Sequence, residues 1–312
     1  MNKILIILFI FFATVVKAEE ISVLEDSLLQ ISTKMLEAAG DDELKFSLNN
    51  QFHQLLHKTL EQPASFKHEF KKLKNITRLS TPDLQYNIIT WMVPNSDGIF
   101  RYFGFTQYYD KKSKKMYVYT LIDNEKDIAA FSTYDDSTWY GILYYEIVPQ
   151  KIKTNNTYLL LGFDANDWLT KKRVIEPITF GLHGKPQFGA TVFKESAEPA
   201  KKKKVKAKKN APPVKKKKVK AEALKSRMIY EHSAQASMSL TFNKDLGMIV
   251  FDHLAPSDEK YKGTYAFYAP DFSYDGFVLK NNKWYLKQNL DARNPKNSKA
   301  KKSDTIGVEP AE

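Results

Sequence analysis

The chain has 312 residues, no cysteine, and 48 basic side chains against 36 acidic ones, which gives a formal net charge of +12. The lack of cysteine excludes thiol catalysis, thiolate metal sites and disulfide cross-links. The net charge does not make the folded body basic, because residues 201–220 hold 12 lysines and no acid, and the rest of the chain is neutral. A chain of this length can bury a large core without cross-links.

Residues 1–18 have the pattern of a secretory signal peptide. Lys3 supplies a positive start, residues 4–16 are apolar, and Val16 and Ala18 place small side chains at a cleavage site. The apolar run is short for a bilayer span, and no later stretch is long and apolar enough for one. We therefore expect an exported protein, periplasmic or extracellular, that is not a lipoprotein and has no transmembrane span after signal cleavage.

Residues 19–63 are predicted to form a helical segment. Apolar side chains recur at helical spacing through residues 21–35 and again through residues 44–56. Between the two stripes, Gly40 and Asp41 are typical of a helix end followed by a new N-cap. Two amphipathic helices are therefore expected at the start of the mature chain.

Residues 64–294 are predicted to form an antiparallel β domain. After about residue 75 the sequence becomes a series of short aromatic and β-branched runs, separated by turn sequences such as PNSDG and NKDLG. Loops this short join antiparallel neighbours. The expected fold class is mainly β, preceded by the two helices. A sandwich, a barrel and a small propeller-like fold all fit the strand count, and no constant period selects among them.

Residues 230–242 alternate apolar and polar side chains, which predicts one strand with a packed face and a polar face. If Phe242 pairs with Met248, Ser237 lies opposite His253. A serine beside a histidine and a carboxylate is the arrangement of a hydrolase, although no Gly-x-Ser-x-Gly turn surrounds this serine. The candidate catalytic residues are Ser237, His253 and Asp252.

Residues 196–226 form a lysine-rich insertion within the β domain, between one strand that ends at Phe193 and another that begins at Met228. Like-charge repulsion and a Pro-Pro pair predict disorder here, as composition does for the tail at 295–312. The insertion is interpreted either as a tolerated surface loop within a hairpin or as a tether to anionic envelope polymers. Lysines without aromatic residues bind polyanions as diffuse charge, so we expect no specific nucleic-acid recognition. The candidate polyanion-binding residues are Lys201, Lys202, Lys203, Lys204, Lys215, Lys216, Lys217 and Lys218.

Residues 271–276 carry oxygen side chains at alternate positions before a glycine, as a calcium loop does, and residues 164–167 show a weaker version. Asn282 occupies the position where a helix–loop–helix calcium site needs a bidentate Glu, so a tight turn before a strand is favoured. His53 and His57 have metal-ligand spacing on a helix, but the Glu of zinc proteases is missing, which favours surface or boundary histidines. No cofactor is predicted, with calcium as the alternative. Its candidate ligands are Asp271, Ser273 and Asp275.

Two carboxylates, Asp135 and Asp136, precede the aromatic residues Trp139 and Tyr140. Aromatic rings stack on pyranose rings and carboxylates bind hydroxyl groups, so this composition suits a glycan-binding face. Aromatic residues make up 13% of the chain, however, and most of these rings are expected to fill the core.

Four segments are distinctive when taken together. They are WYGILYYEIVP (139–149), YLLLGFDANDWLTKKRVIEPITF (158–180), YEHSAQASMSLTFNKDLGMIVFDHLAP (230–256) and YAPDFSYDGF (268–277). Over roughly residues 65–290 the chain resembles a set of uncharacterised exported proteins of Bacteroidota. The resemblance implies an envelope or secreted address, and it carries no established activity, so no catalytic residue follows from it.

The expected function is a non-enzymatic binding or structural role in the cell envelope or outside the cell, with an unknown ligand. One alternative is an extracytoplasmic hydrolase that acts on a glycan or an ester. Another is a polyanion-binding protein that acts through the lysine-rich loop.

Overall fold

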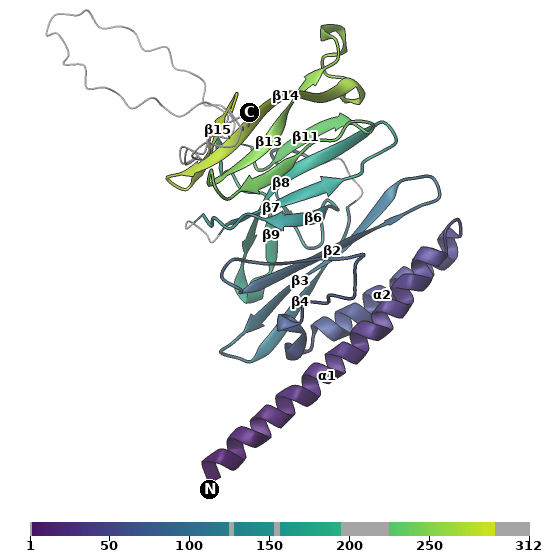
Figure 1. The fold of residues 1–312 in the computed structure, drawn as a ribbon, viewed down its shortest axis with the longest axis vertical. Coiled ribbons are helices and arrows are strands. Elements are labelled where there is room, and N and C mark those ends of the chain that lie inside the picture. Colours follow the sequence, from purple (N-terminus) through teal and green to yellow (C-terminus); the bar gives the residue numbers. More distant parts are fainter. Residues whose placement is uncertain (1, 125–127, 153–156, 195–224, 291–312) are drawn as a thin grey trace, which may run out of the picture.

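The computed structural model describes residues 2–124, 128–152, 157–194 and 225–290. The chain is mainly β and forms three stacked sheets, with two N-terminal helices on the outer face of the first sheet (Figure 1). This confirms the expected fold class. Among the alternatives, the layers correspond to a sandwich extended by a third sheet, and over the described residues no sheet closes into a barrel.

The N-terminal helices form where the sequence predicts them. The elements are α1 (Asn2–Glu37), α2 (Asp42–Leu60) and the short 3-10 helix η1 (Pro63–Lys67). Gly40 ends the first helix with a φ of +88°, and the Asp41 side chain caps the second by accepting from the Leu44 amide at 2.9 Å. In the part of the chain that the structure describes, no helix is long and apolar enough to cross a membrane. Signal cleavage after residue 18 stays a prediction.

The first sheet is an antiparallel meander with the helices on one face. Its strands follow chain order: β1 (Thr77–Ser80), β2 (Tyr86–Pro94), β3 (Phe100–Asp110) and β4 (Lys115–Leu121). On β2, Ile89 and Trp91 pack against the helices, whereas Ile88 points to the next sheet. The Trp91 indole also donates to Asn49 of α2 at 2.9 Å, which fixes the helix on the sheet.

The middle sheet is buried on both faces. Its strand order is β5 (Tyr134–Asp135), β9 (Pro186–Phe188), β8 (Thr170–Phe180), β7 (Tyr158–Asp164) and β6 (Leu143–Ile147), and β11 (Met228–Ser233) pairs with β8. On β7, Tyr158 and Leu160 belong to the core shared with the first sheet, while Leu159 and Leu161 belong to the core shared with the outer sheet. A strand buried on both faces requires a continuous apolar run, which accounts for the sequence YLLLGF.

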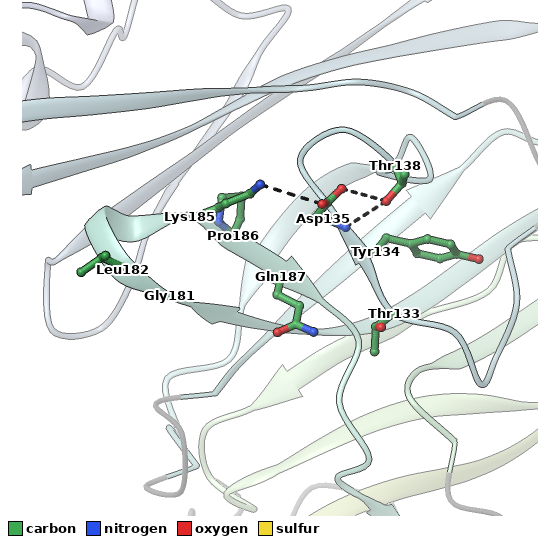
Figure 2. Close-up of a pocket in the computed structure, with 9 residues that line it drawn as sticks. All are labelled: Thr133, Tyr134, Asp135, Thr138, Gly181, Leu182, Lys185, Pro186 and Gln187. Carbon is green, nitrogen blue, oxygen red and sulfur yellow. Dashed lines mark hydrogen bonds and ion pairs between the residues drawn. The ribbon is translucent and has the colours of Figure 1, made fainter.

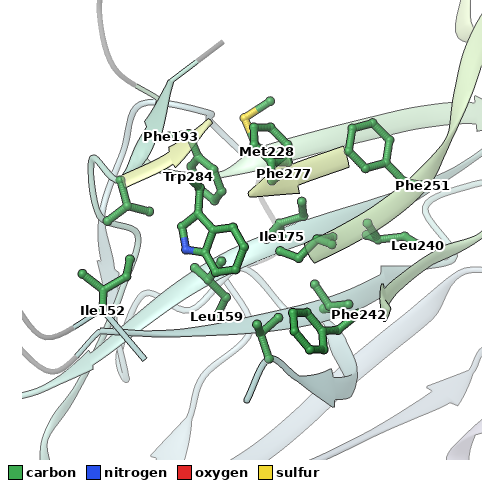
Figure 3. Close-up of a cluster of buried hydrophobic side chains, with 14 of the residues drawn as sticks. Ile152, Leu159, Ile175, Phe193, Met228, Leu240, Phe242, Phe251, Phe277 and Trp284 are labelled. Carbon is green, nitrogen blue, oxygen red and sulfur yellow. The ribbon is translucent and has the colours of Figure 1, made fainter. Parts of the chain in front are cut away.

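The outer sheet covers the remaining face of the middle sheet. Its strand order is β10 (Phe193–Lys194), β15 (Lys283–Lys287), β14 (Tyr268–Lys280), β13 (Met248–Pro256) and β12 (Leu240–Asn243), with β10 parallel to β15. Between the two sheets lies a core of large rings, among them Phe251, Phe277 and Trp284 (Figure 3). Short 3-10 helices lie in the connections: η3 (Leu182–Gly184), η4 (Glu259–Tyr261) and η5 (Tyr265–Phe267).

The predicted single strand over residues 230–242 is wrong. Strand β11 ends at Ser233 in the middle sheet, a turn follows, and β12 begins at Leu240 in the outer sheet. Met228 of β11 and Leu240 of β12 nevertheless pack into the same core between the two sheets. The alternation of apolar and polar residues therefore continues from β11 into β12. For this reason the sequence does not show that the strand ends at Ser233.

The lysine-rich insertion does not interrupt a hairpin, contrary to the prediction. Strand β10 before it pairs with β15 in the outer sheet, and strand β11 after it pairs with β8 in the middle sheet. The insertion thus connects two layers. Residues 195–224 themselves, and the tail at 295–312, lie outside the described residues.

A buried ion pair holds the chain where it enters the middle sheet after the insertion. Arg227 and Glu176 of β8 are 0% and 1% exposed. The guanidinium donates from two nitrogens to both carboxylate oxygens at 2.9–3.1 Å, and its third nitrogen donates to the carbonyls of Ala129 and Ser132. Burial raises the pKa of Glu176, and the charge of Arg227 opposes that rise. One side chain therefore neutralises a buried carboxylate and anchors the loop before β5.

Replacing Arg227 by methionine should lower the free energy of unfolding by about 3–5 kcal/mol, because the substitution leaves a buried carboxylate without its counter-charge. Urea unfolding measures this loss. The matched control is Lys71→Met, which removes one partner of the exposed pair Lys71–Glu69 and should change the free energy of unfolding far less. Equal losses in the two variants would contradict the structural role given to Arg227.

A second ionic contact joins the first sheet to the middle sheet and should make stability depend on pH. The Asp83 carboxylate, in the β1–β2 turn, accepts hydrogen bonds from Lys151 at 2.7 Å and from Tyr158 at 2.6 Å. Burial raises its pKa, but these bonds and one from Thr81 outweigh burial and bring the pKa down to about 2. A lowered pKa in the folded state means that the contribution is complete at neutral pH and is lost as the pH falls from about 4 towards 2.

Asp83→Asn should therefore lower the free energy of unfolding by about 1–2 kcal/mol at pH 7, with solvent screening taken into account. The difference from the wild type should shrink as the pH falls to 2. Urea unfolding across this pH range measures both effects. Asp245→Asn, in the exposed turn between β12 and β13, is the control and should leave the pH profile unchanged. A profile for Asp83→Asn that runs parallel to the wild type would refute this pH dependence.

Candidate functional site

One pocket of about 470 Å³ lies at the edge of the middle sheet, beside β5, β9 and η3; we call it the edge pocket. Figure 2 shows Lys185 reaching towards Asp135 across its rim. The Asp135 carboxylate already accepts from the Ser137 and Thr138 hydroxyls at 2.7 and 2.9 Å, and the Ser137 bonds lower the pKa of Asp135. Lys185 lies 3.3 Å from Asp136 as well. The carboxylates of this pocket are therefore engaged within the protein.

The predicted glycan-binding face at residues 135–140 is not assembled. Asp135 lines the edge pocket, whereas Trp139 is buried in the core between the first and middle sheets, where its indole donates to Tyr144. Tyr140 instead lines a different pocket. These sequence neighbours lie in three different surroundings, because a turn at residues 136–138 separates Asp135 from Trp139, and the next residue, Tyr140, is only half-buried against the core that buries Trp139.

A second pocket, of about 460 Å³, lies where the ends of the first and middle sheets meet; we call it the acidic pocket. The β2–β3 turn and β3 form one wall, and the β7–β8 turn and the segment before β6 form the other. Its lining residues are Asn95, Asp97, Ile99, Phe100, Arg101, Tyr102, Asp123, Tyr140, Gly141, Asp164 and Asn166. Three carboxylates and one guanidinium in this set give the pocket an excess of negative charge.

The Asp164 carboxylate is the buried centre of the acidic pocket. It accepts from the Tyr102 hydroxyl at 3.0 Å, from the Asn166 amide at 2.8 Å, and through a short bond from the Tyr140 hydroxyl. The Lys172 ammonium lies 4.0 Å from it. Burial and the charge of Asp164 raise the pKa of Tyr102 well above its ordinary value. Tyr102 therefore stays protonated, and the hydroxyls of Tyr102 and Tyr140 hold the carboxylate in a fixed orientation.

Asp123 lies on the other side of Tyr102 and accepts from its backbone amide at 3.2 Å. A Cβ on Gly141 would lie 2.5 Å from the Asp123 carboxylate, so this glycine permits the close approach. A further hollow of about 280 Å³ shares Asp123 and Tyr102 with the acidic pocket and extends to His53 on α2. The two hollows are neighbours that share lining residues, and we refer to them together as the acidic groove.

The two helix histidines are boundary residues. His53 and His57 both lie against Phe105 of β3 with tilted rings, whose centroids are 4.6 and 5.5 Å from that of Phe105, and burial lowers the pKa of His53. This packing agrees with the boundary interpretation of their spacing. Over the described residues, no group of three or more histidine, aspartate or glutamate side chains is arranged to hold a metal ion.

Trp168 is 73% exposed and lies next to the residues that line the acidic pocket, although it is not one of them. It belongs to the β7–β8 turn, and its ring lies against Gly98 in the β2–β3 turn. A Cβ on Gly98 would come within 2.2 Å of the indole, and the φ of +77° at this position also favours glycine. Sequence analysis did not select Trp168, because its position depends on a glycine far away in the chain.

The predicted hydrolase residues are not brought together. The observed pairing is Asn243 with Met248 and Leu240 with Phe251, one residue away from the predicted register. The Asp252 carboxylate accepts from the Ser239 amide at 2.6 Å. Among the described residues, no hydrogen bond joins Ser237 to His253, which instead contacts Asp271, with 2.8 Å between Nδ1 and Oδ2. The register that motivated the Ser237–His253 pair was wrong.

The predicted tight turn at 271–276 is also wrong, because the segment lies within β14. Residues Asp271 to Ser273 bulge out opposite His253, and the Ser273 hydroxyl donates to the Asp271 carboxylate at 2.7 Å. Asp275 is buried and accepts from the Asn289 amide at 3.0 Å. Of the three proposed calcium ligands, Asp271 and Ser273 therefore contact each other, whereas Asp275 is buried with a contact of its own. The candidate lysines from Lys201 to Lys218 lie outside the described residues.

Comparisons with protein-family models, with curated proteins and with solved structures find no match for this chain. The roles proposed below therefore rest on the contacts of its own side chains. The resemblance to uncharacterised exported proteins of Bacteroidota stays an expectation.

Tyr102→Phe should lower the free energy of unfolding by about 1–3 kcal/mol, because the hydroxyl donates to buried Asp164 and accepts from the Ala165 amide at 2.7 Å. Thermal or urea unfolding measures the change. Tyr109→Phe, on the same strand but half-buried, is the control and should change stability by less than about 0.5 kcal/mol. A loss for Tyr102→Phe no larger than this control would show that the hydroxyl does not tie the two sheets together.

Proposed function

We propose that this chain is an exported, non-enzymatic binding protein of the cell envelope or the secreted fraction, and that its ligand occupies the acidic groove. The observation that carries the proposal is the set of polar side chains, three of them carboxylates, that converge on one hollow between two sheets. Ligand sites combine a concave surface with a few fixed polar groups, and the acidic groove has both properties.

The polar groups of the groove are held in place before any ligand arrives. Asp164 is fixed by two phenols, and Asp123 is fixed by the Tyr102 amide. Side chains that are already ordered lose little conformational entropy when they bind a ligand. The acidic groove is favoured over the edge pocket because three carboxylates line it, whereas Asp135 is the one carboxylate among the described residues that line the edge pocket.

The charge of the groove indicates the class of ligand. Among the described residues, three carboxylates and one guanidinium line the acidic pocket, and Lys172 lies 4.0 Å from Asp164, so one negative charge remains in excess. This excess disfavours an anion and favours an uncharged or cationic molecule rich in hydrogen-bonding groups. A hydrolase that uses Ser237, Asp252 and His253 has less support, because these residues lie outside the groove and Ser237 makes no hydrogen bond to His253 in the described part of the chain.

The groove proposal predicts a ligand-dependent rise in melting temperature that depends on Asp123. The wild type is screened by thermal shift against sugars, polyols, polyamines and amino acids, each beside an anionic counterpart. At least one uncharged or cationic compound should raise the melting temperature, and Asp123→Asn should abolish the rise. Asp135→Asn, in the edge pocket, is the matched control and should retain it. The proposal fails if only anions stabilise the protein or if both variants respond alike.

The lysine-rich insertion is proposed as a separate electrostatic tether to anionic polymers. Its 12 lysines within residues 201–220 hold the whole excess charge of the chain. The intact protein should be retained on an anionic polymer column and released by a salt gradient, and deletion of residues 201–220 should abolish retention. Deletion of the tail at 295–312, whose charges nearly cancel, is the control. Unchanged retention after deletion of 201–220 would show that the insertion is a tolerated loop.

A further inference from the structure

The indole of Trp168 is exposed beside the acidic groove. The polar groups that line the groove do not explain this exposed apolar surface. Tryptophan carries a large apolar surface, and 73% of the Trp168 surface lies in water, although its burial would stabilise the fold. The neighbouring Leu169 is exposed as well. The β7–β8 turn thus presents apolar surface beside a pocket lined with carboxylates.

We infer that the ligand of the acidic groove is a carbohydrate whose pyranose ring stacks on Trp168 while its hydroxyls bind the carboxylates of the pocket. This inference rests on the proposed function and names its ligand class. A pyranose has an apolar face of C–H groups and a rim of hydroxyls, so it needs an aromatic platform next to hydrogen-bond acceptors. Trp168 and Asp97 supply these two elements from adjacent turns.

The platform is built into the fold by a close contact between the two turns. The Trp168 ring lies where any side chain on Gly98 would collide with it, within 2.2 Å of the position of a Cβ. Gly98 stands between Asp97 and Ile99, both of which line the acidic pocket. This contact places the indole beside the pocket, where a ring that stacks on it can also reach the lining residues.

The carboxylates select among carbohydrates. Among the described residues, Asp97, Asp123 and Asp164 outnumber the two cations beside them, Arg101 in the lining and Lys172 at 4.0 Å from Asp164, so the pocket disfavours uronic acids and phosphorylated or sulfated sugars. Uncharged sugars and amino sugars keep all their hydrogen-bonding groups without this repulsion. The expected ligand is therefore a neutral or amino-sugar unit, either free or within a longer glycan.

Isothermal titration of the full chain tests this inference with cellohexaose, maltohexaose, hexa-N-acetylchitohexaose and polygalacturonate as probes. At least one of the three neutral hexasaccharides should bind saturably, and polygalacturonate should bind more weakly than that hexasaccharide once residues 201–220 are deleted. Trp168→Ala should weaken binding at least about tenfold, because the stacking surface is lost. Trp168→Phe, which keeps a ring, should restore most of the affinity, and Leu169→Ala should leave it within about twofold.

The outcomes separate this inference from the proposal on which it rests. If no neutral hexasaccharide binds, while an amine or amino acid raises the melting temperature in an Asp123-dependent manner, the carbohydrate inference is overturned and the groove proposal stands. If a hexasaccharide binds Trp168→Ala and Asp123→Asn as tightly as it binds the wild type, the inference and the groove proposal are both overturned. Because Trp168 is mostly exposed, its substitution should leave the circular dichroism spectrum unchanged, and Trp168→Phe keeps the test decisive if the alanine variant unfolds.

Discussion

The middle sheet has apolar side chains on both faces, and burying both of them determines the order of the layers. Leu160 of β7 faces one core and Leu159 faces the other, so neither surface of the sheet tolerates water. The outer sheet covers one face and the first sheet covers the second. The first sheet then exposes Trp91 and Phe105 on its far side, and α1 and α2 cover these in turn. Each layer thus covers apolar surface that the adjacent layer would otherwise expose to water.

The acidic groove arises where this layered packing ends. The run of apolar residues on β7 stops at Asp164, whose carboxylate is buried between a phenol from the first sheet, Tyr102, and one from the segment before β6, Tyr140. These bonds join the ends of two layers at the place where the pocket opens. The contacts that hold the layers together therefore also shape the surface on which a ligand would lie, and a substitution in this region affects stability and binding together.

Features set by neighbours along the chain were predictable from the sequence, and features set by distant partners were not. The Asp41 cap and the two helical stripes depend on residues within a few turns, and both were confirmed. The change of sheet after Ser233 was hidden because both strands face one core. The pattern at 164–167 marked a wall of the groove, but as a weak calcium loop, since Tyr102 and Tyr140 are remote in sequence. A register error of one residue was enough to create the false serine–histidine pair.

The connection between β10 and β11 divides the chain without dividing the core. Leu159, Ile175 and Phe193 come before residues 195–224, and Phe251 and Trp284 come after them, yet all five belong to one cluster (Figure 3). A protease cut within that connection would produce two polypeptides. If they separated, each would expose the apolar side chains that it contributes to the shared core. The pieces should stay associated in the native state, so this protein is suited to being expressed as two complementing fragments, with the lysine-rich segment attached to either one.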